Sequence, residues 1–247
     1  MDEFVETLKS GAESLGFPLA GEQMRQCARY CELLLAENQK HNLTSITGQK
    51  EVAVKHFIDS LTCLKAFTPE VGLSLIDVGA GAGFPGLPLK IARPEIRLTL
   101  LESQGKRIKF LEKVKSELKL AGVAVVEGRA EEAGRDGTCR EKFDVAVARA
   151  VAGLSVLSEY CLPLVAVGGL FLALKGPAVE NDLAGAAAAI KVLGGSVSEI
   201  IEIDLPLNGD RRKIVVIEKV SATPAKYPRR TGIPKKKPLG ESESEKR

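Results

Sequence analysis

The sequence predicts an α/β protein in which a mostly parallel, twisted sheet ends in an antiparallel hairpin and follows a helical extension. From residue 71 onward, short apolar runs alternate with helix-like segments, a pattern typical of a parallel sheet covered on both faces. The last two apolar runs are separated only by Leu205–Arg212. This connection is too short for a helical crossover, so the two strands should pair antiparallel.

Residues 1–70 are expected to form the helical extension. Apolar side chains recur there every three or four positions and form one stripe along a helix, made by Met24, Cys27, Cys31, Leu34 and Leu35. A second helix fits Glu51–Phe67 and should end before Pro69, because a proline disfavours the helical conformation in the residue that precedes it.

Residues 71–220 are expected to form the main domain. Its strands are predicted at Ser74–Ala80, Arg97–Ser103, Val123–Arg129, Phe143–Ala150, Gly169–Gly176, Val197–Asp204 and Lys213–Val220. Its helices are predicted at Pro85–Ala92, Gly105–Leu120, Glu131–Ala133, Leu154–Val165 and Ala178–Leu193. These segments alternate until the final hairpin, as the fold class requires.

Residues 221–247 are expected to form a flexible basic tail rich in proline. They hold eight Lys or Arg and three Glu, whereas the rest of the chain holds 27 basic and 29 acidic side chains. A near-neutral body with a basic tail suggests a polyanionic partner. A tail that only improves solubility explains the charge equally well.

Composition argues against several other classes of protein. Five scattered cysteines and two histidines give no zinc-binding pattern, so no metal is expected. The first residues, Met1-Asp2-Glu3, are acidic where a signal peptide would be basic, and no apolar run has membrane-spanning length. We therefore expect a cytoplasmic protein without a membrane partner.

A glycine-rich turn directly after the first predicted strand is the strongest functional signal. The turn has the sequence Asp77-Val78-Gly79-Ala80-Gly81-Ala82-Gly83 and precedes a predicted helix. Glycines allow a tight strand-to-helix turn, and a ligand can lie against their backbone because no Cβ intrudes. In an open α/β sheet such a turn lies at the carboxyl ends of the strands, where ligands bind.

The pattern around this turn favours a ligand that contains adenosine. Gly81-x-Gly83-x-x-Gly86 matches a dinucleotide fingerprint, and Glu102 ends the second strand, where an acid would bind ribose hydroxyls. NAD and S-adenosylmethionine both contain adenosine. Asp77 would repel a pyrophosphate but suits the ammonium and sulfonium groups of S-adenosylmethionine, and Pro85 removes an N–H that could bind phosphate. S-adenosylmethionine is therefore favoured over a nucleotide-linked oxidoreductase.

Several runs, in order along nearly the whole chain, resemble the bacterial glucose-inhibited division protein B family. They are HNLTSIT (41–47), KHFIDSL (55–61), LIDVGAGAGFPGLPLKIARPE (75–95), LLESQGKRIKFLEKV (100–114), VVEGRAEE (125–132), FDVAVARAVAGL (143–154), ALKG (173–176) and, in the tail, YPRRTGIPKKKPL (227–239). Members are ribosomal small-subunit methyltransferases that act on guanine N7. The resemblance implies a Rossmann-like class I methyltransferase, with S-adenosylmethionine as cofactor and guanine 527 of 16S rRNA as target.

The resemblance also implies roles for individual residues. Gly79 and Phe84 would line the cofactor pocket, Gly81 and Gly83 would allow close approach, and Glu102 would hold the ribose. Ala130 and Glu131 would lie beside the adenine, and Arg149 would reach the cofactor or the target base. Asn42, His56, Asp59 and Lys175 could brace the fold or face the site, and both interpretations stay open. Because guanine N7 carries an unshared lone pair, Arg149 would act by positioning, and no general base is expected.

RNA would be held through phosphate contacts that position it without reading its sequence. The candidates are Arg211, Arg212, Lys213, Arg229, Arg230, Lys235, Lys236 and Lys237. The expected partner is 16S rRNA or the small ribosomal subunit, bound by a monomer. Another RNA substrate is the alternative. On this hypothesis, truncation after Val220 would weaken RNA binding and spare cofactor binding.

Overall fold

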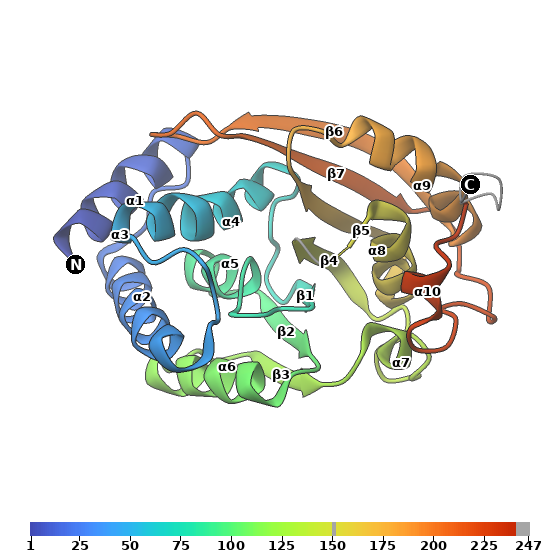
Figure 1. Ribbon diagram of the computed structural model, residues 1–247, viewed down its shortest axis with the longest axis horizontal. Helices are drawn as coiled ribbons and strands as arrows, with labels where there is room; N and C mark the ends of the chain where they lie inside the picture. The colour runs from blue at the N-terminus through green and yellow to red at the C-terminus, as the bar shows by residue number, and fades with distance from the viewer. Residues whose placement is uncertain (150–151, 241–247) are drawn as a thin grey trace.

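The computed structural model describes residues 1–149 and 152–240, apart from the side chain of Asn181. A seven-stranded sheet in the order β3-β2-β1-β4-β5-β7-β6 forms its centre (Figure 1). The strands are β1 (Ser74–Val78), β2 (Arg97–Glu102), β3 (Val123–Glu127), β4 (Phe143–Arg149), β5 (Val165–Lys175), β6 (Gly195–Asp204) and β7 (Arg211–Lys219). Strands β1 to β5 pair in parallel, and β7 pairs antiparallel with both β5 and β6. The predicted fold class is therefore confirmed.

Helices cover both faces of this sheet, as the apolar strands require. One side carries α1 (Asp2–Leu15), α2 (Gly21–His41), α5 (Gly86–Ala92) and α6 (Gly105–Glu117), and the other carries α7 (Ala130–Ala133), α8 (Leu154–Cys161), α9 (Glu180–Val192) and α10 (Ile233–Lys236) (Figure 1). Neighbouring residues of β1 point to opposite sides, so Leu75 belongs to the first core and Ile76 to the second. The helical extension thus packs into the same core as one face of the sheet.

The segment predicted as one helix over Glu51–Phe67 consists of several kinds of helical turn. It runs through α3 (Gln49–Val52), a π-helical stretch η1 (Ala53–Ile58), α4 (Asp59–Leu61) and a 3₁₀ turn η2 (Thr62–Lys65). Helix α1 packs closely against the π-helical stretch, since a Cβ on Gly11 would lie 2.1 Å from the Ile58 side chain. Single π turns occur frequently at functional sites, and this one carries His56 toward the end of β4.

The C-terminal segment over residues 221–240, part of the predicted flexible tail, packs against the domain, and residues 241–247 of that tail lie outside the described residues. The Arg140 guanidinium donates to the Tyr227 carbonyl at 2.8 Å. Arg229 forms a two-pronged ion pair with Glu159 of α8, through Nε at 2.9 Å to Oε1 and Nη2 at 2.7 Å to Oε2. Glu159 is fully buried, so its charge requires such a partner. The proline and lysine content of the tail does not predict the ion pair between Arg229 and Glu159.

Replacing Arg229 by alanine should destabilise the protein strongly, because it leaves the fully buried Glu159 carboxylate without its cation. Breaking one partner of a buried ion pair typically costs about 3–5 kcal/mol. Urea unfolding would measure the loss. The exposed neighbour Arg230 provides the matched control, with a change within about 0.5 kcal/mol for Arg230→Ala. Equal stability of the two variants would show that the Arg229–Glu159 pair does not anchor the segment.

Candidate functional site

A cavity of about 550 Å³ opens where β1, β2, β3 and β4 end. Its walls include seven of the predicted cofactor residues, all at or just after the strand ends. They are Gly79, Gly81, Phe84, Glu102, Ala130, Glu131 and Arg149. Carboxyl ends of parallel strands are the usual ligand site of such sheets. The structure thus brings most of the predicted site residues together around one cavity, with Asp77 and Gly83 outside its wall.

The glycine turn has the left-handed backbone that the sequence pattern indicated. Gly79, Gly81 and Gly83 have φ values of 73°, 60° and 97°. The helical extension braces this turn, because the Tyr30 hydroxyl of α2 donates a hydrogen bond to the Ala82 carbonyl. A Cβ on Gly83 would lie 2.6 Å from that hydroxyl. Gly83 therefore serves close packing against α2, whereas Gly79 and Gly81 face the cavity.

Glu102 holds the glycine turn and faces the cavity at the same time. Its Oε2 accepts from the Gly81 amide at 2.8 Å, and its Oε1 accepts from the Ser103 and Gln104 amides at 2.8 and 2.9 Å. The residue is only 4% exposed. Its carboxylate, at the end of β2, lines the cavity, and its binding of the ribose hydroxyls of an adenosine ligand stays a prediction.

Asp77 takes a different place from the one predicted. Its side chain lies beneath the turn rather than in the cavity wall, and Oδ2 accepts from the Gly86 amide at the start of α5 at 2.8 Å. Within the described residues, Oδ1 is buried without a hydrogen-bond partner. Burial raises the pKa of Asp77 to about 7, although the Gly86 amide opposes the shift. Asp77 thus supports the turn instead of meeting the charges of a cofactor.

One end of the cavity is formed by α7, α8 and the C-terminal segment. Glu131 is 4% exposed, and its Oε1 accepts from the Gly232 amide at 2.9 Å. Tyr160 and Lys235 complete the wall. Burial and the Glu131 charge raise the pKa of Tyr160 to about 12, so its hydroxyl stays protonated. No sequence pattern predicts a role for Tyr160, and Lys235, a predicted RNA contact, lies in the cavity wall.

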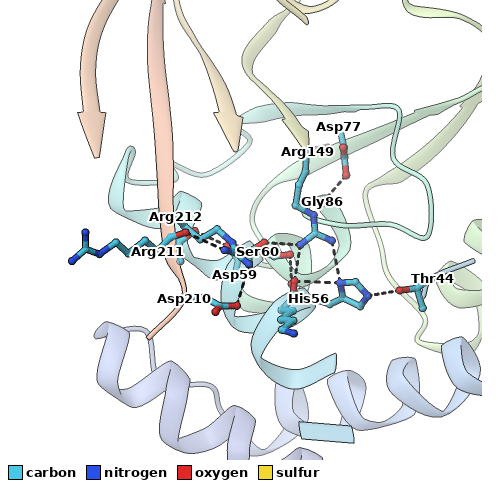
Figure 2. A network of polar contacts seen from close by, with 12 residues as sticks. Thr44, His56, Asp59, Ser60, Asp77, Gly86, Arg149, Asp210, Arg211 and Arg212 are labelled. Atoms are coloured by element: carbon cyan, nitrogen blue, oxygen red, sulfur yellow. Dashed lines mark hydrogen bonds and ion pairs between the residues drawn. The ribbon is translucent and has the colours of Figure 1, made fainter. Parts of the chain in front are cut away.

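Arg149 also lines the cavity and is held by the helical extension (Figure 2). Its Nη1 donates to Asp59 Oδ2 at 2.8 Å and to the Lys55 carbonyl at 3.1 Å. The second Asp59 oxygen accepts from Arg212 Nε at 3.1 Å. Arg149 is therefore both a wall of the cavity and a member of an ion-paired cluster, whereas Asp59 lies outside that wall and braces Arg149.

His56 packs between this cluster and the glycine turn. Its ring stacks on Phe84 with centroids 4.6 Å apart, Nε2 lies 2.8 Å from Thr44 Oγ1, and Arg149 Nη2 lies 3.4 Å from Nδ1. Burial, together with the Arg149 charge, lowers the pKa of His56 to about 4. The imidazole is therefore neutral near pH 7 and adds no charge to the cavity.

Two other residues with open roles take bracing positions. Asn42 ends α2 with a left-handed backbone, φ 47°, and its amide donates to the Asn38 carbonyl. Lys175 donates to Asp182 Oδ2 and to the Ala152 carbonyl, both at 2.8 Å. Both sets of contacts stabilise the protein around the site.

The predicted RNA contacts divide into two groups. Arg212, Lys213 and Arg229 are engaged with carboxylates, namely Asp59, Glu180 with Glu202, and Glu159. Arg230, Lys236 and Lys237 are exposed, and Lys235 is exposed at the cavity wall. Arg211 is exposed as well, although its Nε lies 3.7 Å from Asp204 Oδ1. The exposed group can contact phosphates, whereas the first group is committed to holding the fold.

The described part of the chain has no helix with the length and apolar character needed to cross a bilayer. Nor does it bring together three His, Cys, Asp or Glu side chains as metal ligands.

Comparison with known proteins identifies the family. The family described as rRNA small subunit methyltransferase G matches residues 23–214. The chain belongs to this family. It is 53% identical over 239 residues to ribosomal RNA small subunit methyltransferase G of Pelotomaculum thermopropionicum, covering 97% of this chain and 100% of the relative. The Lactobacillus johnsonii protein of the same name is 51% identical, with coverage of 91% and 95%. Family membership rules out the oxidoreductase alternative.

Solved structures confirm the fold of the methyltransferase domain. A SAM dependent methyltransferase from Aquifex aeolicus matches with a TM-score of 0.51 at 17% identity, covering 67% of this chain and 92% of that one. Precorrin-6y C5,15-methyltransferase from Geobacter metallireducens matches with a TM-score of 0.51 at 16% identity, covering 65% and 88%. At these identities the likeness concerns the fold alone.

The buried carboxyl of Asp77 predicts a particular dependence of stability on pH. Its pKa lies at about 7 in the folded protein against an ordinary 3.8, so the folded state binds the extra proton between these values. Protonation of Asp77 stabilises the folded state fully below about pH 4, and this stabilisation is lost as the pH rises through 7. Relative to Asp77→Asn, the unmodified protein should therefore lose stability between pH 5 and pH 8.

Urea unfolding of both proteins without cofactor at pH 5 and pH 8 measures this difference. His56 titrates in the same range in both proteins, so the comparison isolates Asp77. A difference that is the same at both pH values would contradict the raised pKa.

Proposed function

We propose that this chain transfers a methyl group from its cofactor, S-adenosylmethionine, to N7 of a guanine in 16S rRNA, at guanine 527 by family resemblance. The observation that carries the proposal is the cavity in which the glycine turn, Glu102 and Arg149 meet, in a member of this methyltransferase family. The proposed substrate places the enzyme in the cytoplasm, where we infer that it works as a monomer.

The residues around the cavity fit this cofactor. A volume of about 550 Å³ lies within the usual range for small-ligand sites, about 300–1,000 Å³. Glu102 would hold the ribose hydroxyls, Ala130 and Glu131 would lie beside the adenine, and Gly79 and Gly81 would allow the cofactor to lie against the backbone. When bound, S-adenosylmethionine supplies a methyl group on a positively charged sulfur.

Methylation at guanine N7 requires positioning more than acid–base chemistry. N7 has an in-plane lone pair, so no proton needs to be removed before it attacks, and the product is a cationic base. The task of the protein is to align the nitrogen with the methyl carbon, which can lower the barrier by about 7–11 kcal/mol at best. Arg149, in the wall of the cavity at the end of β4, is suited to orient the base through its hydrogen bonds.

The charges around Arg149 suit a reaction that leaves positive charge on the purine. Asp59 offsets part of the charge of Arg149 and Arg212 at contact distances of 2.8 and 3.1 Å. Burial keeps His56 neutral, as its lowered pKa shows, so it adds no cation beside the base. The cluster can therefore orient the guanine with limited repulsion as its charge develops.

RNA would be held outside the cavity by the exposed basic residues. Arg211, Arg230, Lys236 and Lys237 can contact phosphates, which would position the RNA independently of its sequence. The target guanine must be unstacked, or lie in an exposed loop, to enter a cavity of this size. This requirement agrees with a target in a structured ribosomal RNA loop.

A tritiated-methyl transfer assay would test the proposal. The substrates would be 30S subunits and naked 16S rRNA from cells that lack the enzyme, and borohydride–aniline cleavage would then locate 7-methylguanine. We expect one cut in the 530 loop. Label at another nucleotide or base atom would overturn the proposed target, and absence of label with bound cofactor would overturn the rRNA substrate.

Replacing Arg149 by alanine should slow methyl transfer by about a hundredfold or more, since a misplacement of about 1 Å can have that effect. Single-turnover rates with saturating cofactor would measure the change. Lys191→Ala, an exposed residue of α9 outside the cavity wall, is the control and should retain the full rate. An unchanged rate for Arg149→Ala would exclude Arg149 from positioning the reactants.

A further inference from the structure

The C-terminal segment reaches the cofactor cavity, and we name residues 229–237 the C-terminal clasp. Its first residue, Arg229, is fixed twice on Glu159 of α8, through its amide at 2.7 Å and through its guanidinium. Glu159 has no exposed surface. The clasp therefore starts from a rigid anchor on the helix that also carries Tyr160 to the cavity wall.

The middle of the clasp contacts the residues that follow β3. The Thr231 hydroxyl lies 3.3 Å from Glu132 Oε1, and the Gly232 amide donates to Glu131 Oε1 at 2.9 Å. Gly232 has φ 81°, a backbone conformation that glycine adopts without strain. The bond fixes the carboxylate of Glu131, which is buried and lines the cavity.

The last turn of the clasp, α10, places Lys235 in the cavity wall, near Tyr160 and Glu131. Pro234 of the same turn is buried, which holds the turn against the domain. This end of the cavity therefore offers the Lys235 ammonium group as a donor and the Glu131 carboxylate as an acceptor. The edge of an adenine has the complementary pattern, with ring nitrogens that accept and an amino group that donates.

Resting on the proposed placement of the adenine beside Glu131, we propose that the C-terminal clasp is part of the cofactor site. The Gly232 amide positions Glu131 for the adenine amino group, and Lys235 contacts the adenosine moiety directly. The charge of this segment predicts RNA binding, and the proposal adds a contact with the adenine of the cofactor. A chain that ended at Val220 would lose cofactor affinity, in contrast to the expectation from sequence.

Two truncated chains provide a direct test. A chain ending at Arg230 keeps the Arg229–Glu159 anchor and lacks Gly232 and Lys235, whereas a chain ending at Gly240 keeps the whole clasp. Calorimetry would give the dissociation constant for S-adenosylmethionine, and thermal unfolding without cofactor would compare the folds. We expect affinity at least about tenfold weaker, about 1.4 kcal/mol, for the Arg230 chain only. Equal affinities would overturn the proposal.

A point variant keeps the test decisive if the shorter chain unfolds. Lys235→Ala should weaken cofactor binding by about fivefold to tenfold, a loss within the net range of one ordinary hydrogen bond. Lys226→Ala, an exposed lysine of the same segment outside the clasp, should leave it unchanged. If Lys235→Ala weakens binding to 16S rRNA and leaves the cofactor dissociation constant unchanged, Lys235 is an RNA contact and the proposal fails.

Discussion

The arrangement of the site depends on the buried carboxylate of Asp59. It lies between Arg149 at the end of β4 and Arg212 at the start of β7, and it is only 4% exposed. Arginine is rarely buried without a partner, and an uncompensated buried charge typically costs about 3–5 kcal/mol. The Asp59 carboxylate of the helical extension therefore positions the guanidinium groups of two strands of the sheet.

The helical extension is consequently part of the site rather than an appendage to it. Tyr30 holds the carbonyl of Ala82 in the glycine turn, and its ring stacks on Phe84 with centroids 5.1 Å apart. His56 covers another side of Phe84. The C-terminal clasp makes the corresponding contact in the cavity wall through Gly232 and Glu131. The helical extension and the C-terminal clasp thus both contact residues of the cavity wall.

The sequence predicted the parts of the fold that depend on local patterns. Apolar runs located every strand, and the position of Glu102 at the end of β2 located a residue of the cavity wall. The contacts that hold Arg149 and Arg229 could not be predicted, because Asp59 and Glu159 lie 90 and 70 residues away along the chain. Asp77 was misplaced because its position at a strand end does not show whether the carboxylate points into the cavity or under the turn.

The role proposed for Asp59 is to hold Arg149 in place to orient the target base, and the single-turnover methyl-transfer rate of Asp59→Asn would reveal it. We expect a rate about a hundredfold lower, with the dissociation constant for S-adenosylmethionine nearly unchanged. Asp210→Asn, which changes the more exposed partner of Arg212 at 3.6 Å, should keep the full rate. A full rate for Asp59→Asn, in a protein that remains folded, would show that the reaction does not depend on the contact between Asp59 and Arg149.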